Sequence, residues 1–263
     1  MALTLQTVTP GRGALWVRDG LRLFLKRALA FSSLFALFLF AALFASLLPG
    51  VGGVLQMMMV PLLSLGFMVA SQAALLEQPI GPRQFIEPLT ASPAQRRDLL
   101  VLCALYGLAV LSVFWLADLA ADGGYERLFE LLRQSPVPVA EVDALLVERG
   151  MVSGALVATL GLTLVSIPFW HAPALVHWGR QGVLQSLFSS ALAVWRCRGA
   201  FVVYALAWAA VMTGVAVFSA LLVGLLGMAR MVPLLAMPIG LFISAWFYVS
   251  LIFTFNDSFG SRA

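Results

Sequence analysis

The sequence predicts an all-α integral membrane protein with six transmembrane helices, and three observations lead to this prediction. Hydrophobic residues make up 62% of the 263 residues, whereas an ordinary soluble domain has about 45–50%. Charged residues make up only 11%, against about 25% in soluble domains. Six continuous apolar runs are each long enough to cross a hydrocarbon core of about 30 Å as a helix. These features exclude an ordinary soluble enzyme, a disordered chain and a nucleic-acid-binding domain.

The apolar runs and the polar segments between them predict the organisation of the chain. Helices are expected because lipid cannot satisfy open backbone groups, and continuous runs are unlike the alternating segments of a β-barrel. The expected membrane-spanning segments are 28–48, 54–76, 99–120, 151–176, 199–226 and 231–255. Together they form a membrane domain over 28–256, which follows an amphipathic segment at 1–27 and precedes a tail at 257–263.

The distribution of basic residues predicts the orientation of the chain in the membrane. Of the 16 Lys and Arg residues, 12 lie in the N-terminal segment, the second and fourth connections and the C-terminal tail. Since Lys and Arg near helix ends favour the cytoplasmic side, we expect both termini in the cytoplasm. The first apolar run is longer than the core of a signal peptide, so we expect it to be retained as a helix.

Several connections show the patterns of amphipathic helices. The outer loop 121–150 is rich in acids, and apolar residues at helical spacing flank a proline-containing break at 135–138. Segment 178–198 is typical of a helix that lies in the cytoplasmic interface, and the N-terminal segment and a short stretch around Phe85 look similar. The outer loop is either a plain connector or a docking surface for a partner.

Weak internal similarity indicates three repeated helical hairpins. Segment 59–63 recurs as 231–235, and 44–48 resembles 218–222, at offsets of 172 and 174 residues. Each third would contain a cytoplasmic interfacial helix, an outgoing helix and a returning helix, so the repeats would share one orientation. Chance similarity in low-complexity apolar sequence is the alternative explanation.

The returning helices carry prolines, which free backbone carbonyls and kink a helix. In lipid the freed groups need partners from neighbouring helices, so these helices are candidates for the interior of the bundle. The candidate residues are Pro61, Pro168, Pro173, Pro233 and Pro238. Simple packing irregularity is the alternative interpretation.

The remaining candidate residues are histidines and tryptophans. His171 and His177 lie near the cytoplasmic end of the fourth run, where a histidine hydrogen-bonded to a freed carbonyl is favoured over a metal pair. Two histidines and two distant cysteines give no metal, haem or disulfide pattern, so we expect no cofactor. The expected interfacial anchors are Trp16, Trp170, Trp178 and Trp195.

Three stretches carry a resemblance to a known group, namely 16–20, 169–176 and the helix that leads to 195–198. With these stretches the chain resembles an uncharacterised inner-membrane protein family of proteobacteria, mostly betaproteobacteria, whose members are called hypothetical transmembrane proteins. The plan of hairpins with interfacial helices is also similar to that of YciC-like proteins and of the membrane domain of glycerophosphodiester phosphodiesterases. The catalytic part of those phosphodiesterases is a separate soluble domain, so the resemblance implies location and fold but no activity.

These observations predict a non-catalytic protein of the inner membrane, which acts as an accessory, assembly or organising component of a membrane complex or of the bilayer. Charged groups are scarce at the middle of the apolar runs, which disfavours catalysis and ion coupling. The alternative is a passive transporter or permease for a lipid-like or apolar small molecule, with a cavity lined by the second, fourth and sixth helices. Expected partners are membrane lipids and a membrane protein or a second copy of the chain, but not nucleic acid.

Overall fold

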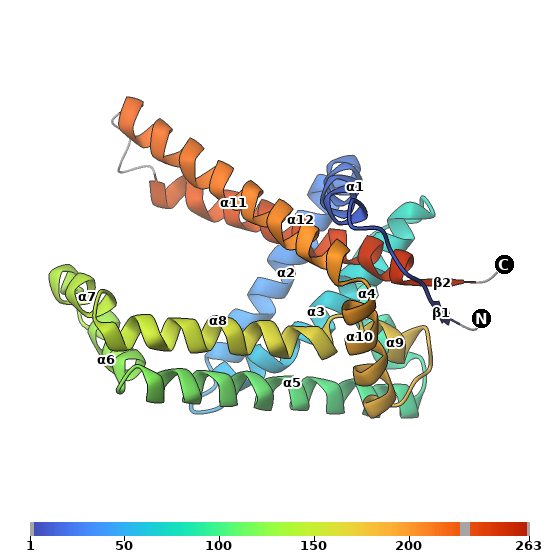
Figure 1. Ribbon diagram of the computed structural model, residues 1–263, viewed down its shortest axis with the longest axis horizontal. Coiled ribbons are helices and arrows are strands. Elements are labelled where there is room, and N and C mark those ends of the chain that lie inside the picture. Colours follow the sequence, from blue (N-terminus) through green and yellow to red (C-terminus); the bar gives the residue numbers. More distant parts are fainter. Residues whose placement is uncertain (1–2, 227–231, 262–263) are drawn as a thin grey trace.

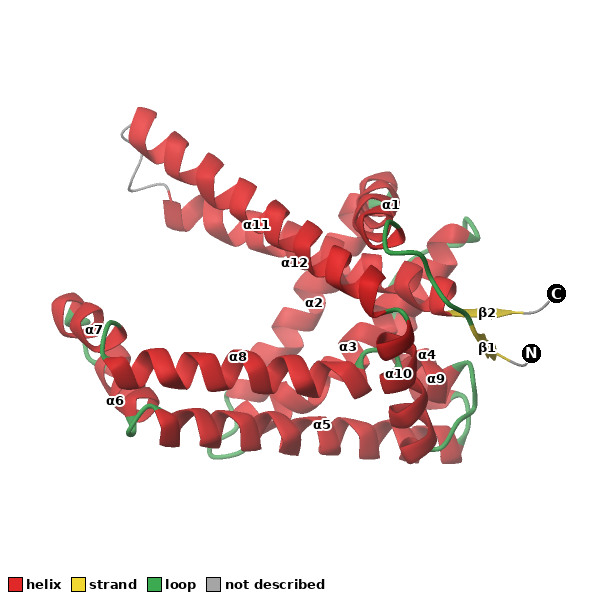
Figure 2. Ribbon diagram, viewed as in Figure 1, coloured by secondary structure: helices red, strands yellow, loops and turns green. Residues whose placement is uncertain are grey.

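The computed structural model describes the backbone of residues 3–226 and 232–261 and the side chains of 4–222 and 236–260. Within these residues the chain is almost entirely helical (Figure 2). The long helices are α2 (Ala28–Ser46), α3 (Gly52–Leu75), α5 (Pro93–Ala120), α8 (Arg149–Phe169), α11 (Arg198–Leu226) and α12 (Val232–Ser258). Six segments are long and apolar enough to cross a membrane, which confirms the prediction of an all-α membrane protein.

The shorter elements connect these helices or lie against their ends. They are α1 (Arg12–Lys26), α4 (Arg83–Thr90), α6 (Gly124–Arg133), α7 (Val139–Leu146), α9 (Ala172–His177) and α10 (Val183–Arg196). Strands β1 (Leu3–Leu5) and β2 (Phe259–Ser261) pair antiparallel, so the two ends of the chain lie side by side. The internal repeat and the interfacial position of α1 and α10 stay predictions.

The fourth apolar run is broken, whereas the sequence predicts a continuous helix over 151–176. Pro173 lies in the first turn of α9 and has no N–H to donate. The hydroxyl of Ser190 on α10 donates to the carbonyl of Ile167 (3.1 Å) and accepts from the N–H of His171 (3.0 Å). Side-chain hydrogen bonds from α10 therefore replace the missing helical ones at the break.

The long helices leave one end of the molecule, which carries both termini, and diverge from it (Figure 1). We call this end the base; it comprises β1, α1, residues 170–198 and the end of α12 from Trp246 onward together with β2. The pair α5–α8 and the pair α11–α12 point away from the base in different directions (Figure 1). We call α6, α7, residues 149–163 of α8 and residues 209–222 of α11 the arms.

Close helix packing at the base depends on two glycines of α1. The α-carbon of Gly13 lies against the carbonyl oxygen of Ala200 on α11, where no side chain fits. A Cβ at Gly20 would lie 2.6 Å from the Cβ of Ser250 on α12. This contact lets the aromatic face of α1 enter the protein core, in which Trp16 is completely buried.

Candidate functional site

A cavity of about 190 Å³ lies between α3, α5, α8 and α12. Its wall includes three residues from α3, one from α5 and the residues at which α8 ends. The cavity therefore lies where the second, third, fourth and sixth membrane-spanning segments meet. Half of its lining residues are aromatic: Tyr106, Phe169, Trp170, Phe247 and Tyr248.

The cavity lies at the middle depth of the membrane-spanning segments. Ser64 and Tyr106 lie within about one residue of the midpoints of α3 and α5, and Tyr248 lies three residues from the midpoint of α12. Tyrosine is usually enriched at the membrane surface, where its hydroxyl meets water. Tyr106 and Tyr248 line one cavity close to the middle of their helices. They therefore place two hydroxyl groups at a depth where side chains are usually apolar.

The local sequence explains the shape of the cavity wall on α3 and α8. Pro61 lacks an N–H, so the helix loses one backbone hydrogen bond beside the cavity. The hydroxyl of Ser64 donates to the carbonyl of Pro61 at 2.9 Å, and that of Ser166 donates to the carbonyl of Thr163 at 2.7 Å. Both serines satisfy their donors on their own helices, so neither ties the wall to a neighbouring helix.

The tyrosines of the membrane-spanning segments differ in how their hydroxyls are satisfied. The hydroxyl of Tyr204 lies 2.7 Å from the hydroxyl of Ser250 in the core. Tyr106 and Tyr248, in contrast, form no hydrogen bond with the part of the chain that the structure describes. Both side chains are half-buried and line the cavity, and neither hydroxyl is among the fully covered polar atoms of the described chain.

The sequence analysis did not identify Ser64, Tyr106, Ser166 or Tyr248 as candidate residues. The available signal was the position of the two tyrosines near the centre of apolar runs. Periodicity does not show which faces of different helices meet, so it could not place these side chains around one space.

The predicted proline candidates are distributed over different surroundings. Pro61 is buried and lines the cavity, Pro168 is half-buried on α8, and Pro173 is buried at the beginning of α9. Pro238 is exposed on α12, so its ring does not lie in the interior of the bundle. The side chain of Pro233 lies outside the described residues.

The two histidines lie outside the residues that line this cavity. His171 is completely buried, and the edges or faces of Phe201, Phe255 and Phe259 surround its ring. The expected hydrogen bond from His171 to a freed carbonyl is wrong, because Ser190 binds that carbonyl instead and neither ring nitrogen has a partner among the described residues. His177 is half-buried beside Trp178, with ring centroids 5.6 Å apart. Among the described residues, no group of three His, Cys, Asp or Glu could hold a metal ion.

The four tryptophans predicted as interfacial anchors also differ. Trp16 is completely buried, so its ring cannot contact lipid, and that prediction is wrong for this residue. The reason is that the apolar face of α1 packs onto α11 and α12. Trp170 and Trp178 are half-buried, whereas Trp195 is exposed and lies 5.5 Å from the guanidinium carbon of Arg198.

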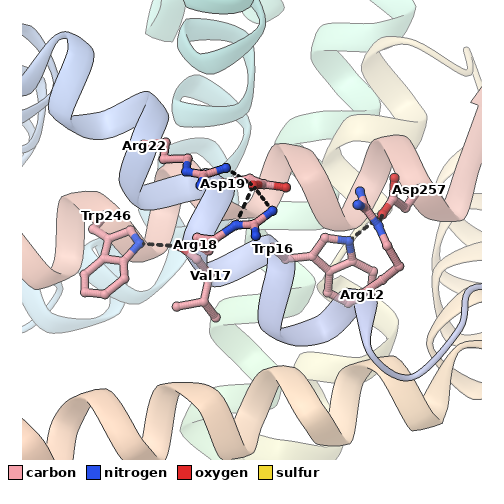
Figure 3. A network of polar contacts seen from close by, with 8 residues as sticks. All are labelled: Arg12, Trp16, Val17, Arg18, Asp19, Arg22, Trp246 and Asp257. Atoms are coloured by element: carbon pink, nitrogen blue, oxygen red, sulfur yellow. Dashed lines mark hydrogen bonds and ion pairs between the residues drawn. The ribbon is translucent and has the colours of Figure 1, made fainter.

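A polar network fixes α1 to the end of α12 (Figure 3). Asp257 accepts hydrogen bonds from the indole of Trp16 and from Arg12, both at 2.7 Å. The indole of Trp246 on α12 donates to the carbonyl of Val17 at 2.8 Å. The hydrogen bond to the Asp257 carboxylate stabilises the charged guanidinium and raises the pKa of Arg12 above its ordinary value. These contacts hold the base together beside the aromatic core.

Comparison with known proteins places the chain among inner membrane proteins. No protein-family model and no solved structure matches it. Over 256 residues the chain is 32% identical to a probable inner membrane protein of Burkholderia thailandensis, and the match covers 96% of this chain and 93% of the relative. The match and the six apolar helices support a multi-pass inner membrane location and the resemblance to a betaproteobacterial membrane-protein family. The chain belongs to the family of this Burkholderia inner membrane protein.

Proposed function

We propose that the protein is a non-catalytic component of the inner membrane that organises a membrane complex through its arms and uses no cofactor. The observation that carries the proposal is the small covered fraction of three long apolar helices, two of which form part of the arms. In an apolar stretch of 18 residues in each helix, only 11% of the residues in α11 and 17% of those in both α2 and the fourth span are buried within the described chain. The remaining faces contact lipid or another membrane protein, which includes a second copy of this chain.

The cap formed by α6 and α7 gives the arms a second surface with different chemistry. A groove of about 400 Å³ between the two helices is lined by Arg127, Glu130, Glu141 and Glu148. Exposed charges of both signs contribute more to the specificity of binding than to its affinity. An acidic cap above apolar helices suits a membrane protein with a basic outer segment, and it disfavours nucleic acid.

Affinity purification of the full chain in mild detergent tests this proposal. We expect a stoichiometric protein partner or a second copy to be recovered with the wild type. Leu160→Trp on α8 and Leu221→Trp on α11 should reduce this recovery, because both side chains are exposed and a bulky ring disturbs a packed helix pair. Leu184→Trp on α10 of the base, which is 80% exposed, is the matched control. A monodisperse chain with no stoichiometric protein would contradict the proposal.

The proposed orientation has the base at the cytoplasmic side of the membrane, with strands β1 and β2 in the cytoplasm, and the α6–α7 cap on the outer side. In support of it, most basic residues belong to elements of the base or to the connections on the same side. A reporter that is active only in the cytoplasm tests the orientation when it is fused to the C-terminus and, separately, inserted between α6 and α7. Activity of the inserted reporter without activity of the C-terminal fusion would reverse the orientation.

The cavity favours a second candidate function, the passive transport of a lipid-like or apolar small molecule. It is lined by α3, α8 and α12, which are the second, fourth and sixth membrane-spanning helices. Several lining residues are only half-buried, which leaves the space accessible from outside the bundle. A cavity at this depth is a place where a membrane-soluble molecule can leave the surrounding lipid.

Vesicles that contain the purified protein test the transport function. We expect faster passage of an apolar small molecule than in protein-free vesicles, and a loss of this effect in Ser166→Leu, which fills the cavity. Ser153→Leu, on the same helix but outside the cavity lining, is the control. Equal rates with and without protein would exclude this candidate.

A further inference from the structure

We infer that the cavity between α3, α5, α8 and α12 binds the planar ring of an uncharged, lipid-soluble compound that carries carbonyl oxygens, namely a quinone. The inference rests on the cavity that supports the transport proposal, but it concerns binding alone. A protein that binds a quinone and does not pass it across the membrane would satisfy it.

The size of the cavity fits one ring. An apolar cavity of about 150 Å³ in a protein interior is known to bind benzene. The cavity here has about 190 Å³, which is room for a six-membered ring with small substituents. The complete head group and two chains of a phospholipid need a much larger pocket, on the order of several hundred Å³.

The lining provides aromatic surfaces around that space. Tyr106 meets Phe169 edge to face with centroids 5.2 Å apart, and Trp170 meets Phe247 at 6.2 Å. Tyr248 lies beside Phe247 at 5.4 Å. Aromatic rings prefer offset-stacked or edge-to-face neighbours, and a planar guest can be accommodated in either geometry.

The hydroxyls of Tyr106 and Tyr248 determine which kind of molecule the cavity can bind. An alkyl chain offers no acceptor, so it would leave the hydroxyls of Tyr106 and Tyr248 without partners away from water. A charged head group at this depth carries a large desolvation cost. A neutral ring with carbonyl oxygens satisfies both constraints, because each oxygen accepts a hydrogen bond and the molecule dissolves in lipid.

The route into the cavity also favours a membrane-soluble compound. The hydroxyl-bearing residues Ser64, Tyr106, Ser166 and Tyr248 are all half-buried, so the cavity is not sealed by protein. Because Ser64 and Tyr106 lie at mid-span and Tyr248 lies close to it, the medium outside is the hydrocarbon of the bilayer. A quinone with an apolar tail can place its ring between the helices while the tail stays in lipid.

Binding of a short-tailed benzoquinone to the full-length protein in lipid nanodiscs tests the inference. Quenching of tryptophan fluorescence measures binding, and Trp170→Phe should remove a large share of the quenching because this ring lines the cavity. An alkylbenzene with the same tail is the comparison ligand, and competition with the quinone reports its affinity. We expect the quinone to bind about a hundredfold more tightly than the alkylbenzene, since only the quinone accepts a hydrogen bond from each of the two hydroxyls.

Tyr106→Phe and Tyr248→Phe remove the hydroxyls and keep the rings. Each should weaken quinone binding by about tenfold and leave alkylbenzene binding unchanged, whereas Tyr125→Phe outside the cavity should change neither. Thermal unfolding of each variant establishes that it is folded. The inference is overturned if the quinone does not bind, if both ligands bind equally, or if the double Phe variant keeps wild-type quinone affinity. Quinone binding without transport in vesicles would contradict the transport proposal and leave this inference standing.

Discussion

At the base, Trp16 is completely buried and hydrogen-bonded to Asp257, whereas Leu156 and Leu160 on the α8 helix that carries the cap are 59% and 64% exposed. Both regions consist of apolar helices, but they are stabilised differently. The base combines an aromatic core with polar bonds between residues that are far apart in the sequence. The arms have long-range contacts mainly along the α5–α8 pair and in the cap.

This difference follows from the solvent around each region. In hydrocarbon, exposure of leucine carries no cost, so apolar arms can diverge without a hydrophobic penalty. Near the ends of the helices, polar groups must find partners or water, and Trp16, Arg12 and Asp257 bind one another. We therefore expect substitutions at the base to affect stability and substitutions on the arms to affect contacts with other molecules.

The largest effect is expected for Gly13→Ala. The added Cβ meets backbone atoms of α11 at Ala200 and Tyr204, which cannot rotate away, so α1 must move. We expect a loss of about 3 kcal/mol in the free energy of unfolding and labelling of the otherwise buried Cys197 by a thiol reagent. Gly11→Ala is the matched control because no atom lies within 4 Å of its Cβ. Equal stability of the two variants would show that α1 is not packed as described.

Ser190→Ala should have the second largest effect. It leaves the N–H of His171 and the carbonyl of Ile167 without the hydroxyl that both use at the break between α8 and α9. Unsatisfied buried backbone groups cost about 1–3 kcal/mol, so we expect a lower melting temperature in detergent. The half-buried Ser189 on the same helix provides the control variant Ser189→Ala. If the two variants have the same melting temperature, the break between α8 and α9 does not depend on the contact with α10.

Asp257→Asn should have a smaller effect. The amide still accepts a hydrogen bond from Trp16, but the charge that pairs with Arg12 is lost at a site that is partly exposed. We expect the free energy of unfolding to fall by about 1 kcal/mol. This loss should be smaller at high salt, because salt screens the ion pair. Asp98→Asn is the control, since its carboxylate pairs with the adjacent, exposed Arg97. A salt-independent loss would show that packing rather than charge fixes α1.

The smallest effect is expected on the arms. Arg127→Gln removes an ion pair with Glu148 in which both side chains are 49% exposed. We expect the free energy of unfolding, measured by thermal unfolding, to fall by less than about 0.5 kcal/mol. If the organising role is correct, the same variant should weaken recovery of the partner in affinity purification. A large loss of stability would remove the distinction between base and arms.

Some features of the fold and site could be predicted from residues alone, and others could not. The six spans follow from the length of the apolar runs, and the proline-containing break at 135–138 agrees with the separation of α6 from α7 in the structure. Trp16 lies on an apolar helix face that could meet either lipid or protein, so its burial could not be predicted. The break at His171 depends on Ser190, a residue from another helix, and local pattern contains no information about that contact.

The sequence by itself determined that this protein belongs in a membrane, how many times the described chain can cross it, and that charge is scarce at mid-span. These properties depend on composition and length, because the bilayer acts on each apolar run separately. Only the tertiary structure decided which helix faces meet. It placed Tyr106 and Tyr248 around one cavity and buried Trp16 against Asp257. Such contacts join residues from separate helices, and lipid favours no particular pairing of apolar faces, so shape and a few polar groups make that choice.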